Sequence, residues 1–518
     1  MGACTRSRLV PHHFSLGRRA GLLLPLWSVR GEGGDLGSYA DAGAVARWLL
    51  SSRCTLWQLL PLNEVSPGQD SPYAASSSCA LEPVYADIGP LELTDAERSA
   101  LDAARADKRV DFTAFRRVKR SALAREFARF RERELGKSSE TDRALRRFRE
   151  EHREWIEEWA LYRALHDRRQ KSWRDWEPEL RDRNPAALER ARGELRGAID
   201  ELIYVQFIAD EQWQRGRKEA NRQGVKVLGD LPFMVAEDSA DVWSFQHLFR
   251  FDATVGVPPD AYSAEGQDWG LPVPRWDEMR AQGDPWLHMR AQRAAELYDA
   301  YRVDHVVGLY RTYVRPIDKS APYFVPAEER QQREQGERIL TLLGEKAEVL
   351  AEDLGIVPDF VRQSLAEQEI PGTKVLRWEN DRGVPRDVRK FPHVSVTVTG
   401  THDTEPLAIW WEALPQWERE QQLTQPALRR LRGPEQHLFT AQTRSALLEL
   451  AYSAASDALL TPITDGLGWR DRMNIPGTVG SHNWTFRLPW TLTELWNAPE
   501  AVAMARELAH LAERYDRK

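Results

Sequence analysis

Eight short apolar runs, most of them separated by helical patterns, constrain the fold of this 518-residue chain more than any other feature. They cover residues 21–26, 55–62, 225–233, 301–309, 348–355, 373–380, 394–403 and 458–468. Strands that are apolar along their whole length are buried on both faces, and their alternation with helices indicates a parallel sheet. Eight such units predict a closed (β/α)₈ TIM barrel, with a doubly wound open sheet as the alternative.

The stretch from about residue 91 to about 220, between the second and third runs, is too long for one crossover. It is charged and helix-forming, with apolar residues three and four positions apart. We therefore expect a mainly helical insertion, with further loop insertions, in one catalytic barrel domain that spans residues 1–518. The arginine runs of the insertion could form a nucleic-acid patch, but Glu and Arg interleave at helical spacing, which favours solvated helix faces.

Charge and cysteine content exclude several classes of partner. The net charge is −7, which disfavours binding to an acidic polymer such as a nucleic acid. The chain has three cysteines, Cys4, Cys54 and Cys79, without metal-ligand spacing, which suits a reducing compartment and argues against structural zinc.

The N-terminus has no apolar signal region, and its first apolar run is too short to span a bilayer. We expect a cytoplasmic protein with no membrane or nucleic-acid partner, either a monomer or a weak homodimer.

Four of the eight runs contain acidic side chains where their apolar part ends. In a barrel of this kind, residues at the carboxyl ends of the strands share one pocket. The acids are Asp230, Asp304, Glu352 with Asp353, and Asp403, which follows His402. One such acid could simply cap the next helix. Four together favour a pocket in which carboxylates work as pairs, as glycoside chemistry requires: one attacks the anomeric carbon and another protonates the leaving oxygen.

The run 301–309, YRVDHVVGL, contains charges within an apolar strand pattern. Side chains alternate along a strand, so Arg302 and Asp304 are predicted to share one face while Val303 points to the other. An arginine beside a nucleophilic carboxylate stabilises its negative charge. We therefore expect the valines to form the barrel wall and the Arg302–Asp304 pair to emerge at its mouth.

An ordered set of motifs resembles the 4-alpha-glucanotransferases, also called amylomaltases, of the alpha-amylase clan. Its four central motifs are GDLPFMVAEDSADVW (229–243), RVDH (302–305), AEDLG (351–355) and GTHD (400–403). Further matches are GEGGDLG (31–37), WQLLPL (57–62), SPYAASS (71–77), GVPPDAYSAEGQDWG (256–270), IPGTKVLRWE (370–379) and RMNIPGTVGSHNW (472–484). The resemblance covers roughly residues 18 to 490.

The resemblance implies a retaining transfer of a segment of an alpha-1,4-glucan to the 4-hydroxyl of glucose or a maltooligosaccharide. It assigns Asp304 as the nucleophile, Glu352 as the general acid/base and Asp403 as the stabiliser of the transition state. It also implies substrate-binding roles for Tyr73, Asp230, Gln267, Trp269, Arg302, His402 and Asn474. Side chains fill every chemical role, so no cofactor or metal is expected.

The chain departs from the family's usual pattern at several loop positions. Ala261, Tyr262 and Ser263 stand where the family has Tyr-Phe-Ser, and Leu271 stands where it has Asn. Two further departures are Thr404-Glu405-Pro406 in place of Asn-Asp-Thr, and Glu82 in place of Asn before Pro83. None of these touches the catalytic trio, so they bear on donor length, acceptor preference and the formation of large cyclic glucans.

Two other functions fit parts of the same pattern. A hydrolase of the same clan would share the fold and the trio, because these do not decide between water and a sugar as the acceptor. A non-catalytic glucan-binding protein would have lost a member of the trio, whereas all three acids are present.

Overall fold

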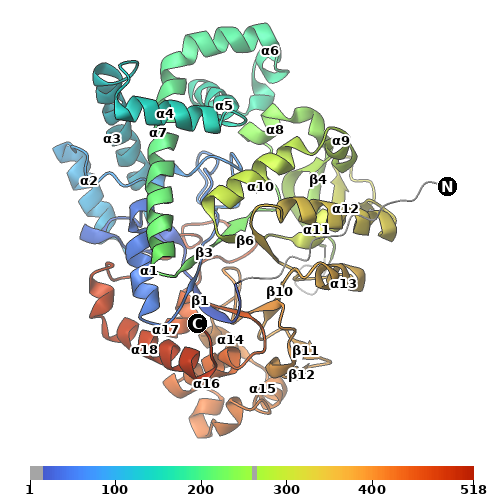
Figure 1. Ribbon diagram of the computed structural model, residues 1–518. Helices are drawn as coiled ribbons and strands as arrows, with labels where there is room; N and C mark the ends of the chain where they lie inside the picture. The colour runs from blue at the N-terminus through green and yellow to red at the C-terminus, as the bar shows by residue number, and fades with distance from the viewer. Residues whose placement is uncertain (1–15, 260–264) are drawn as a thin grey trace.

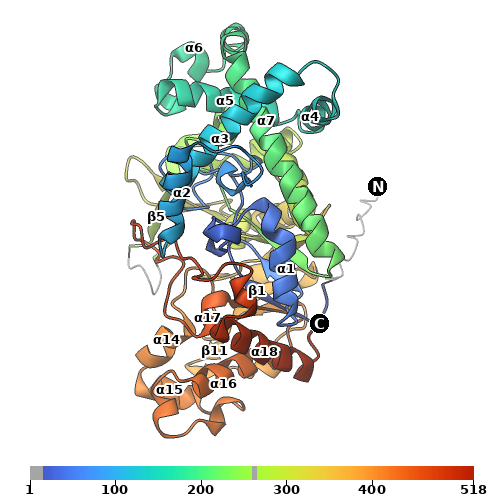
Figure 2. The ribbon, with the colours of Figure 1, turned by 90° about the vertical axis from the view of Figure 1, so that its left-hand side faces the viewer.

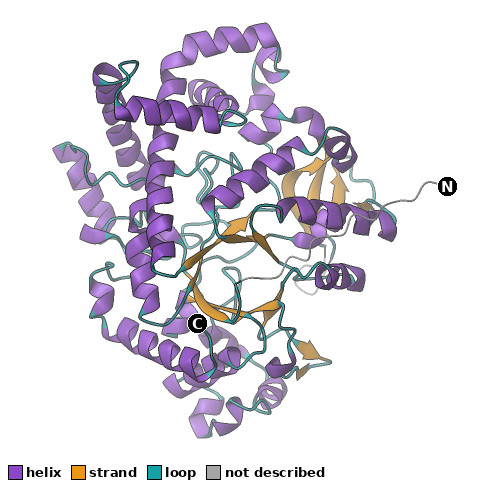
Figure 3. Ribbon diagram, in the orientation of Figure 1, coloured by secondary structure: helices purple, strands orange, loops and turns teal. Residues whose placement is uncertain are grey.

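A computed structural model describes residues 16–259 and 265–518, and its centre is a closed barrel of eight parallel strands (Figures 1 and 3). The strand order around the barrel is β1-β14-β13-β10-β9-β6-β3-β2. The bounds are β1 Arg19–Leu23, β2 Leu56–Gln58, β3 Lys226–Leu231, β6 Ala300–Val303, β9 Glu348–Ala351, β10 Gly372–Val375, β13 Ser395–Val398 and β14 Ala458–Pro462. Each strand falls within or overlaps one of the eight expected runs, so the TIM-barrel prediction is confirmed.

The barrel closes where the first and last of these strands pair in parallel. Arg19 of β1 lies opposite Ala458 of β14, and the register continues to Leu23 opposite Pro462. On its other edge β1 pairs with β2, with Gly21 opposite Leu56. This pairing leaves neither edge of the barrel sheet open.

One expected strand is shorter than predicted. The chain leaves β6 after Val303, and Val306–Tyr310 forms a short helix, α11. The break falls at His305, whose backbone has the left-handed φ of 44°. Val306 and Val307 are buried, but they pack from this helix, so the prediction that they form the barrel wall is wrong.

Apolar side chains fill the inside of the barrel. Leu56, Leu228, Leu350, Val396 and Leu460, from five different strands, belong to a buried cluster that is separate from the main core. Because side chains alternate along a strand, residues two positions further along point the same way. Asp230 follows Leu228 and Glu352 follows Leu350 at this spacing, so the apolar filling gives way to acids toward the carboxyl ends of the strands.

Six helices fill the connection between β2 and β3, and most of them stand above the barrel in Figures 1 and 2. They are α2 Asp95–Ala106, α3 Phe112–Arg133, α4 Glu140–Glu151, α5 Ile156–Arg169, α6 Pro178–Arg181 and α7 Pro185–Arg222. Their arginines form ion pairs with acids, as Arg125 does with Glu97 and Arg149 with Glu157. This pairing is what solvated helix faces predict.

The 38-residue helix α7 returns the chain from the insertion to the barrel and leads into β3. Asn184 caps its start, with its side chain accepting from the backbone N–H groups of Ala186 and Ala187. At Gly216 the helix passes so close to Tyr39 that an added Cβ would lie 2.4 Å from the carbonyl oxygen of Tyr39. The insertion is therefore packed directly on the barrel's own elements.

A second, antiparallel sheet covers one side of the barrel mouth (Figure 3). Its order is β5-β4-β7-β8, with bounds β4 Phe249–Val257, β5 Gln267–Pro274, β7 Thr312–Pro316 and β8 Tyr323–Val325. The first two strands lie between β3 and β6, and the other two between β6 and β9. The expected loop insertions therefore include a small sheet, together with a two-stranded hairpin of β11 Asn380–Asp381 and β12 Val384–Pro385.

The other helices surround the barrel. Their bounds are α1 Ala42–Leu50, α8 Ala240–Ser244, α9 Trp276–Ala281, α10 Pro285–Leu297, α12 Glu329–Leu343, α13 Asp359–Glu367, α14 Leu407–Ala413, α15 Gln416–Gln422, α16 Ala441–Tyr452, α17 Ile463–Leu467 and α18 Pro499–Arg514. Within the described ranges, every helix is too short or too polar to cross a membrane. Cys54 and Cys79 are buried free thiols, and Cys4 lies outside the described residues.

Candidate active site

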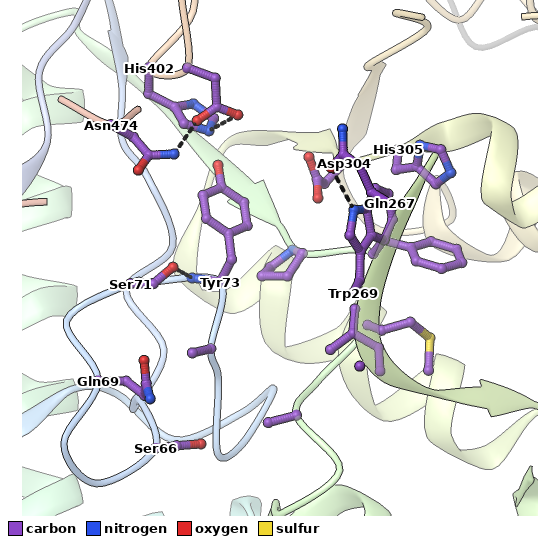
Figure 4. Close-up of a pocket in the computed structure, with 18 of the residues that line it drawn as sticks. Ser66, Gln69, Ser71, Tyr73, Gln267, Trp269, Asp304, His305, His402 and Asn474 are labelled. Carbon is purple, nitrogen blue, oxygen red and sulfur yellow. Dashed lines mark hydrogen bonds and ion pairs between the residues drawn. The ribbon is translucent and has the colours of Figure 1, made fainter. Parts of the chain in front are cut away.

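A cavity of about 740 Å³ opens at the carboxyl ends of the barrel strands (Figure 4). Nine of the ten residues predicted for the site line it: Tyr73, Gln267, Trp269, Arg302, Asp304, Glu352, His402, Asp403 and Asn474. The tenth, Asp230, lies at its base with no side-chain surface exposed. In Figure 4, Tyr73, His402 and Asn474 face Asp304, Gln267 and Trp269 across the opening.

Arg302 connects two carboxylates at the bottom of this cavity. It lies opposite Asp230 in the register between β6 and β3. Its Nη1 donates to both oxygens of Asp230 at 2.7 Å, and its Nη2 donates to Oδ1 of Asp304 at 2.8 Å. The prediction that Arg302 and Asp304 share one face is thus matched by a direct ion pair between them. The guanidinium stabilises the negative charges of both Asp230 and Asp304.

Asp230 is fully engaged by its neighbours. The Tyr73 hydroxyl donates to its Oδ2 at 2.6 Å, in addition to the two bonds from Arg302. Burial raises the pKa of the Asp230 carboxyl, and Arg302 opposes that rise. With no exposed surface, Asp230 can act on a sugar in this arrangement only through Tyr73 and Arg302.

Glu352 follows β9 directly and has a different environment from Asp304. Its Oε2 accepts a hydrogen bond of 2.8 Å from the backbone N–H of His305, so the left-handed turn after β6 also orients this acid. Burial raises the pKa of the Glu352 carboxyl to about 8, and the negative charge of Asp304 adds to the rise against the opposing effect of Arg302. The raised pKa favours the protonated form of Glu352.

Asp403 is held as an anion by the residues around it. Asn474 Nδ2 donates to its Oδ1 at 2.6 Å, and His402 Nε2 lies 3.3 Å from its Oδ2. Burial would raise the pKa of Asp403, but His402 and Asn474 outweigh it and hold the pKa at about 2. Arg472 donates to the backbone oxygens of both Asp403 and Asn474, which fixes the two segments together.

The loop that carries His402 and Asp403 is anchored by buried charges. Asp465 accepts from the Thr399 hydroxyl at 2.7 Å and from the backbone N–H of Leu407 at 2.7 Å. Arg377 pairs with Glu405 at 3.0 Å. Glu405, one of the positions at which the chain departs from the family's pattern, therefore forms an ion pair beside the site.

Aromatic rings form two walls of the cavity. On one side Tyr73 stacks on His402 with ring centroids 5.1 Å apart, and Trp484 packs 5.7 Å from Tyr73. On the other side the rings of Trp269 and His305 form an edge-to-face pair, with ring centroids 4.8 Å apart. Burial lowers the pKa of His305 to about 4, so this imidazole is neutral. Flat faces of this kind suit the apolar faces of sugar rings.

Several residues that line the cavity or, like Arg472, support its loops are not predicted from the sequence. Arg472 and Trp484 are the first and last residues of the motif 472–484, but only Asn474 within it was assigned a role. His305 belongs to the RVDH motif, where its position next to an acid was the only signal. Ser66 and Gln69 precede the SPY motif, and nothing in their residue types marks them as part of a site.

The departures from the family fall in different places. Leu271 lines the cavity, whereas the side chain of Glu82 is buried behind it. Ala261, Tyr262 and Ser263 lie outside the described residues. Among the described residues no group of three His, Cys, Asp or Glu side chains is arranged to hold a metal ion.

Comparison with known proteins assigns the family. Residues 24–493 match the family model described as 4-alpha-glucanotransferase. The chain belongs to this family. A 4-alpha-glucanotransferase from Thermus thermophilus is 32% identical over 519 residues, with 96% of this chain and 99% of the relative covered. The chloroplastic/amyloplastic 4-alpha-glucanotransferase of Solanum tuberosum is also 32% identical, over 91% of this chain and 82% of the relative.

Solved structures agree on the fold. The amylomaltase from Streptococcus agalactiae, in complex with acarbose, has a TM-score of 0.81 at 24% identity, over 96% of this chain and 99% of that one. The amylomaltase from Corynebacterium glutamicum has a TM-score of 0.79 at 22% identity, over 95% and 75% of the two chains. This 4-alpha-glucanotransferase is thus an enzyme that transfers segments of alpha-1,4-glucans, built on a (β/α)₈ barrel.

Proposed function

We propose that this 4-alpha-glucanotransferase works by double displacement, with Asp304 as nucleophile, Glu352 as general acid/base and Asp403 as stabiliser of the transition state. The observation that carries the assignment is the contrast between two acids in one cavity. The Glu352 carboxyl has a raised pKa, which favours its protonated form, while Asp304 is paired with the guanidinium of Arg302 at 2.8 Å. Retaining chemistry needs such a pair, one acid to donate a proton and one carboxylate to attack.

In the first step, an oxygen of Asp304 attacks C1 of the donor sugar and forms a β-linked ester. The bond from C1 to the glycosidic oxygen breaks, and Glu352 gives its proton to that oxygen, which leaves as the 4-hydroxyl of the departing glucan. In the second step, Glu352 takes the proton from the 4-hydroxyl of an acceptor, whose oxygen attacks C1 and releases Asp304. Two inversions restore the α configuration.

We propose that Tyr73, Arg302 and His402 bind the sugar on the donor side of the cleaved bond. The stack of Tyr73 on His402 presents an aromatic face beside the Arg302 centre. Asp230 would hold Tyr73 and Arg302 in place, because its carboxylate is bonded to both. Gln267, Trp269 and Asn474 would shape neighbouring subsites, with Gln267 Oε1 accepting from Trp269 Nε1 at 3.2 Å.

Transfer requires that a sugar hydroxyl intercept the intermediate before water does. Bound sugar raises the local concentration of that hydroxyl and displaces solvent, and the aromatic walls of the cavity support such binding. The donor would be an alpha-1,4-glucan, and the acceptor glucose or a maltooligosaccharide. We expect a cytoplasmic enzyme that is a monomer or a weak homodimer, which light scattering over a concentration series would check.

Incubation with maltotriose alone is expected to give glucose and a ladder of longer oligosaccharides. Each transfer conserves the number of glycosidic bonds, so the total of reducing ends should stay constant while chain lengths spread. Chromatography of the products together with a reducing-end assay measures both. Accumulation of only glucose and maltose, with rising reducing ends, would instead establish the hydrolase alternative.

The alkaline limb of the pH profile is expected to report Glu352. Catalysis needs this acid protonated when the donor bond breaks, so kcat/KM should fall tenfold per pH unit above about pH 8, where the raised pKa of Glu352 lies. The measurement is kcat/KM for maltotriose from pH 5 to 10, within the range in which circular dichroism shows the fold intact. A fall that begins near the ordinary glutamate pKa would contradict the role.

A further inference from the structure

The loop from Leu62 to Glu82 carries Tyr73 and forms one wall of the active-site cavity. Its two sides pair through backbone bonds: the N–H of Glu82 donates to Leu62, and the N–H of Ser66 donates to Ala74. The tip between them supplies Ser66, Gln69, Ser71 and Tyr73 to the cavity lining. Figure 4 shows these four side chains along one continuous stretch of chain.

A second cavity of about 650 Å³ lies behind the same loop. Its lining includes Glu64, Val65, Pro67 and Gly68 from the loop, together with side chains of α3, α5 and α7. Ser66 lines both cavities. The loop tip is therefore a partition between two open spaces, without a close-packed core behind it. On the side of the helical insertion, its position depends on polar contacts that reach across this second cavity.

Arg116 of α3 makes the contacts that join the tip of this loop to its base. At the tip, its Nη1 donates to Oδ1 of Asp70 at 2.8 Å. At the base, its Nε lies 3.5 Å from Oε1 of Glu82, whose Oε2 accepts from the N–H of Val65 at 3.0 Å. The guanidinium of Arg116 also lies over the ring of Phe112, with Cζ 4.9 Å from the ring centroid.

A second anchor fixes only the base. Glu64 Oε1 lies 3.0 Å from Nε of Arg163, and its Oε2 accepts from the indole N–H of Trp159 at 2.8 Å, both from α5. Among the ion pairs of the described residues, the link from the insertion to the tip is the one through Arg116 and Asp70. The tip can therefore shift if this link is lost while the base remains anchored.

The tip is coupled to the catalytic centre through Tyr73. The Tyr73 hydroxyl donates to Asp230, Asp230 pairs with Arg302, and Arg302 pairs with Asp304. Asp70 is three residues from Tyr73, so a displacement of the tip changes where the Tyr73 ring meets a sugar. A shift of about 1 Å in such a positioning contact is enough to weaken binding and transfer.

We propose that Arg116 is a positioning residue, through which the helical insertion sets the place of the Tyr73 loop and hence the strength of sugar binding beside Asp304. The inference rests on the proposed role of Tyr73 in binding sugar. The two contacts of Arg116 differ in exposure: the Asp70 side chain is 42% exposed and that of Glu82 is 7% exposed. Salt should therefore weaken the tip contact more than the base contact.

The test compares Asp70→Asn, which removes the negative charge of the tip contact and leaves the base contact unchanged, with the double variant Arg116→Met/Glu82→Gln. The double variant removes a cation and its buried partner together, and the glutamine oxygen can still accept from Val65, so no buried charge is left unpaired. Arg120→Met is the matched control. It lies on the same helix and lines the same second cavity, but its partner is Asp167 and not the loop.

In steady-state transfer from maltotriose, we expect KM to rise about fivefold in Asp70→Asn and about tenfold in the double variant, with kcat within about twofold of the wild type. Arg120→Met should leave both unchanged. Raising the ionic strength should increase KM of the wild type and have a smaller effect in Asp70→Asn. Unchanged KM in both loop variants, with or without a lower melting temperature, would show that Arg116 has only a structural role.

A binding measurement separates this inference from the proposed catalytic roles. The dissociation constant of maltoheptaose is measured by calorimetry in a Glu352→Gln background with and without Asp70→Asn. A weakening of about fivefold supports the inference even if Glu352→Gln retains turnover, in which case the role of Glu352 fails alone. Equal dissociation constants overturn the inference and leave the catalytic assignment standing.

Discussion

Replacement of Asp304 by asparagine is expected to reduce kcat for maltotriose disproportionation by a factor on the order of 10⁴ to 10⁶. The amide cannot form the ester with C1, so the covalent route is lost. The fold should persist, because the asparagine carbonyl still accepts from Arg302, and Arg302 keeps its two bonds to Asp230. Kinetics with a sensitive product assay, together with circular dichroism of the variant, measure both effects.

A chemical control distinguishes loss of the nucleophile from general damage. In Asp304→Gly the missing side chain leaves space beside C1, and azide added with α-maltosyl fluoride can attack there while fluoride leaves. The expected product is a β-maltosyl azide, of configuration opposite to the donor. An α-azide, or rescue only in a Glu352 variant, would show that Asp304 is not the attacking group.

Replacement of Glu352 by glutamine is expected to lower transfer from maltotriose by a factor of about 10³ to 10⁴. The glutamine keeps the size and the bond to His305 but has no proton to donate to the glycosidic oxygen. Fluoride leaves without protonation, so α-maltosyl fluoride should still react with Asp304 at a much less reduced rate. The slow second step, which lacks its base, should then let the ester accumulate.

Intact mass spectrometry of this variant should show one added maltosyl group, which peptide mapping should place on Asp304. The alkaline limb near pH 8 should also disappear from the residual activity, because the titrating group is gone. Equal slowing of maltotriose and maltosyl fluoride, without accumulation of an ester, would contradict the acid/base assignment.

The barrel could be predicted because its signal is local and repeated. Each strand buries both faces, so each apolar run reads as a strand without knowledge of its neighbours. The exception, at 301–309, has a backbone cause: His305 takes a left-handed conformation, which ends β6 after Val303 and starts a helix. Alternation of apolar residues cannot reveal a single reversed φ in a histidine.

The acids of the site could also be predicted. Each lies at or just after the end of a strand, and the apolar runs of the sequence indicate where those strands are. The sequence predicts the pairing of Arg302 with Asp304 but not its pairing with Asp230. The contact with Asp230 depends on the register between β3 and β6. The roles of Arg472 and Trp484 in shaping the site depend on contacts between distant loops. The antiparallel sheet that carries Gln267 and Trp269 joins segments from two connections, so no single stretch indicated it.

The pairing of β1 with β14 has a consequence for synthesis on the ribosome. The sheet can close only after Ala458, the partner of Arg19, has been synthesised. At about 5 to 20 residues per second, the time between the synthesis of these two residues is roughly 20 to 90 s. Throughout it, β1 presents an open edge that can pair with strands of other nascent chains. Slowing translation of the last barrel strand should therefore lower the soluble yield of this enzyme, and faster decoding or a chaperone that shields the first strand should restore it.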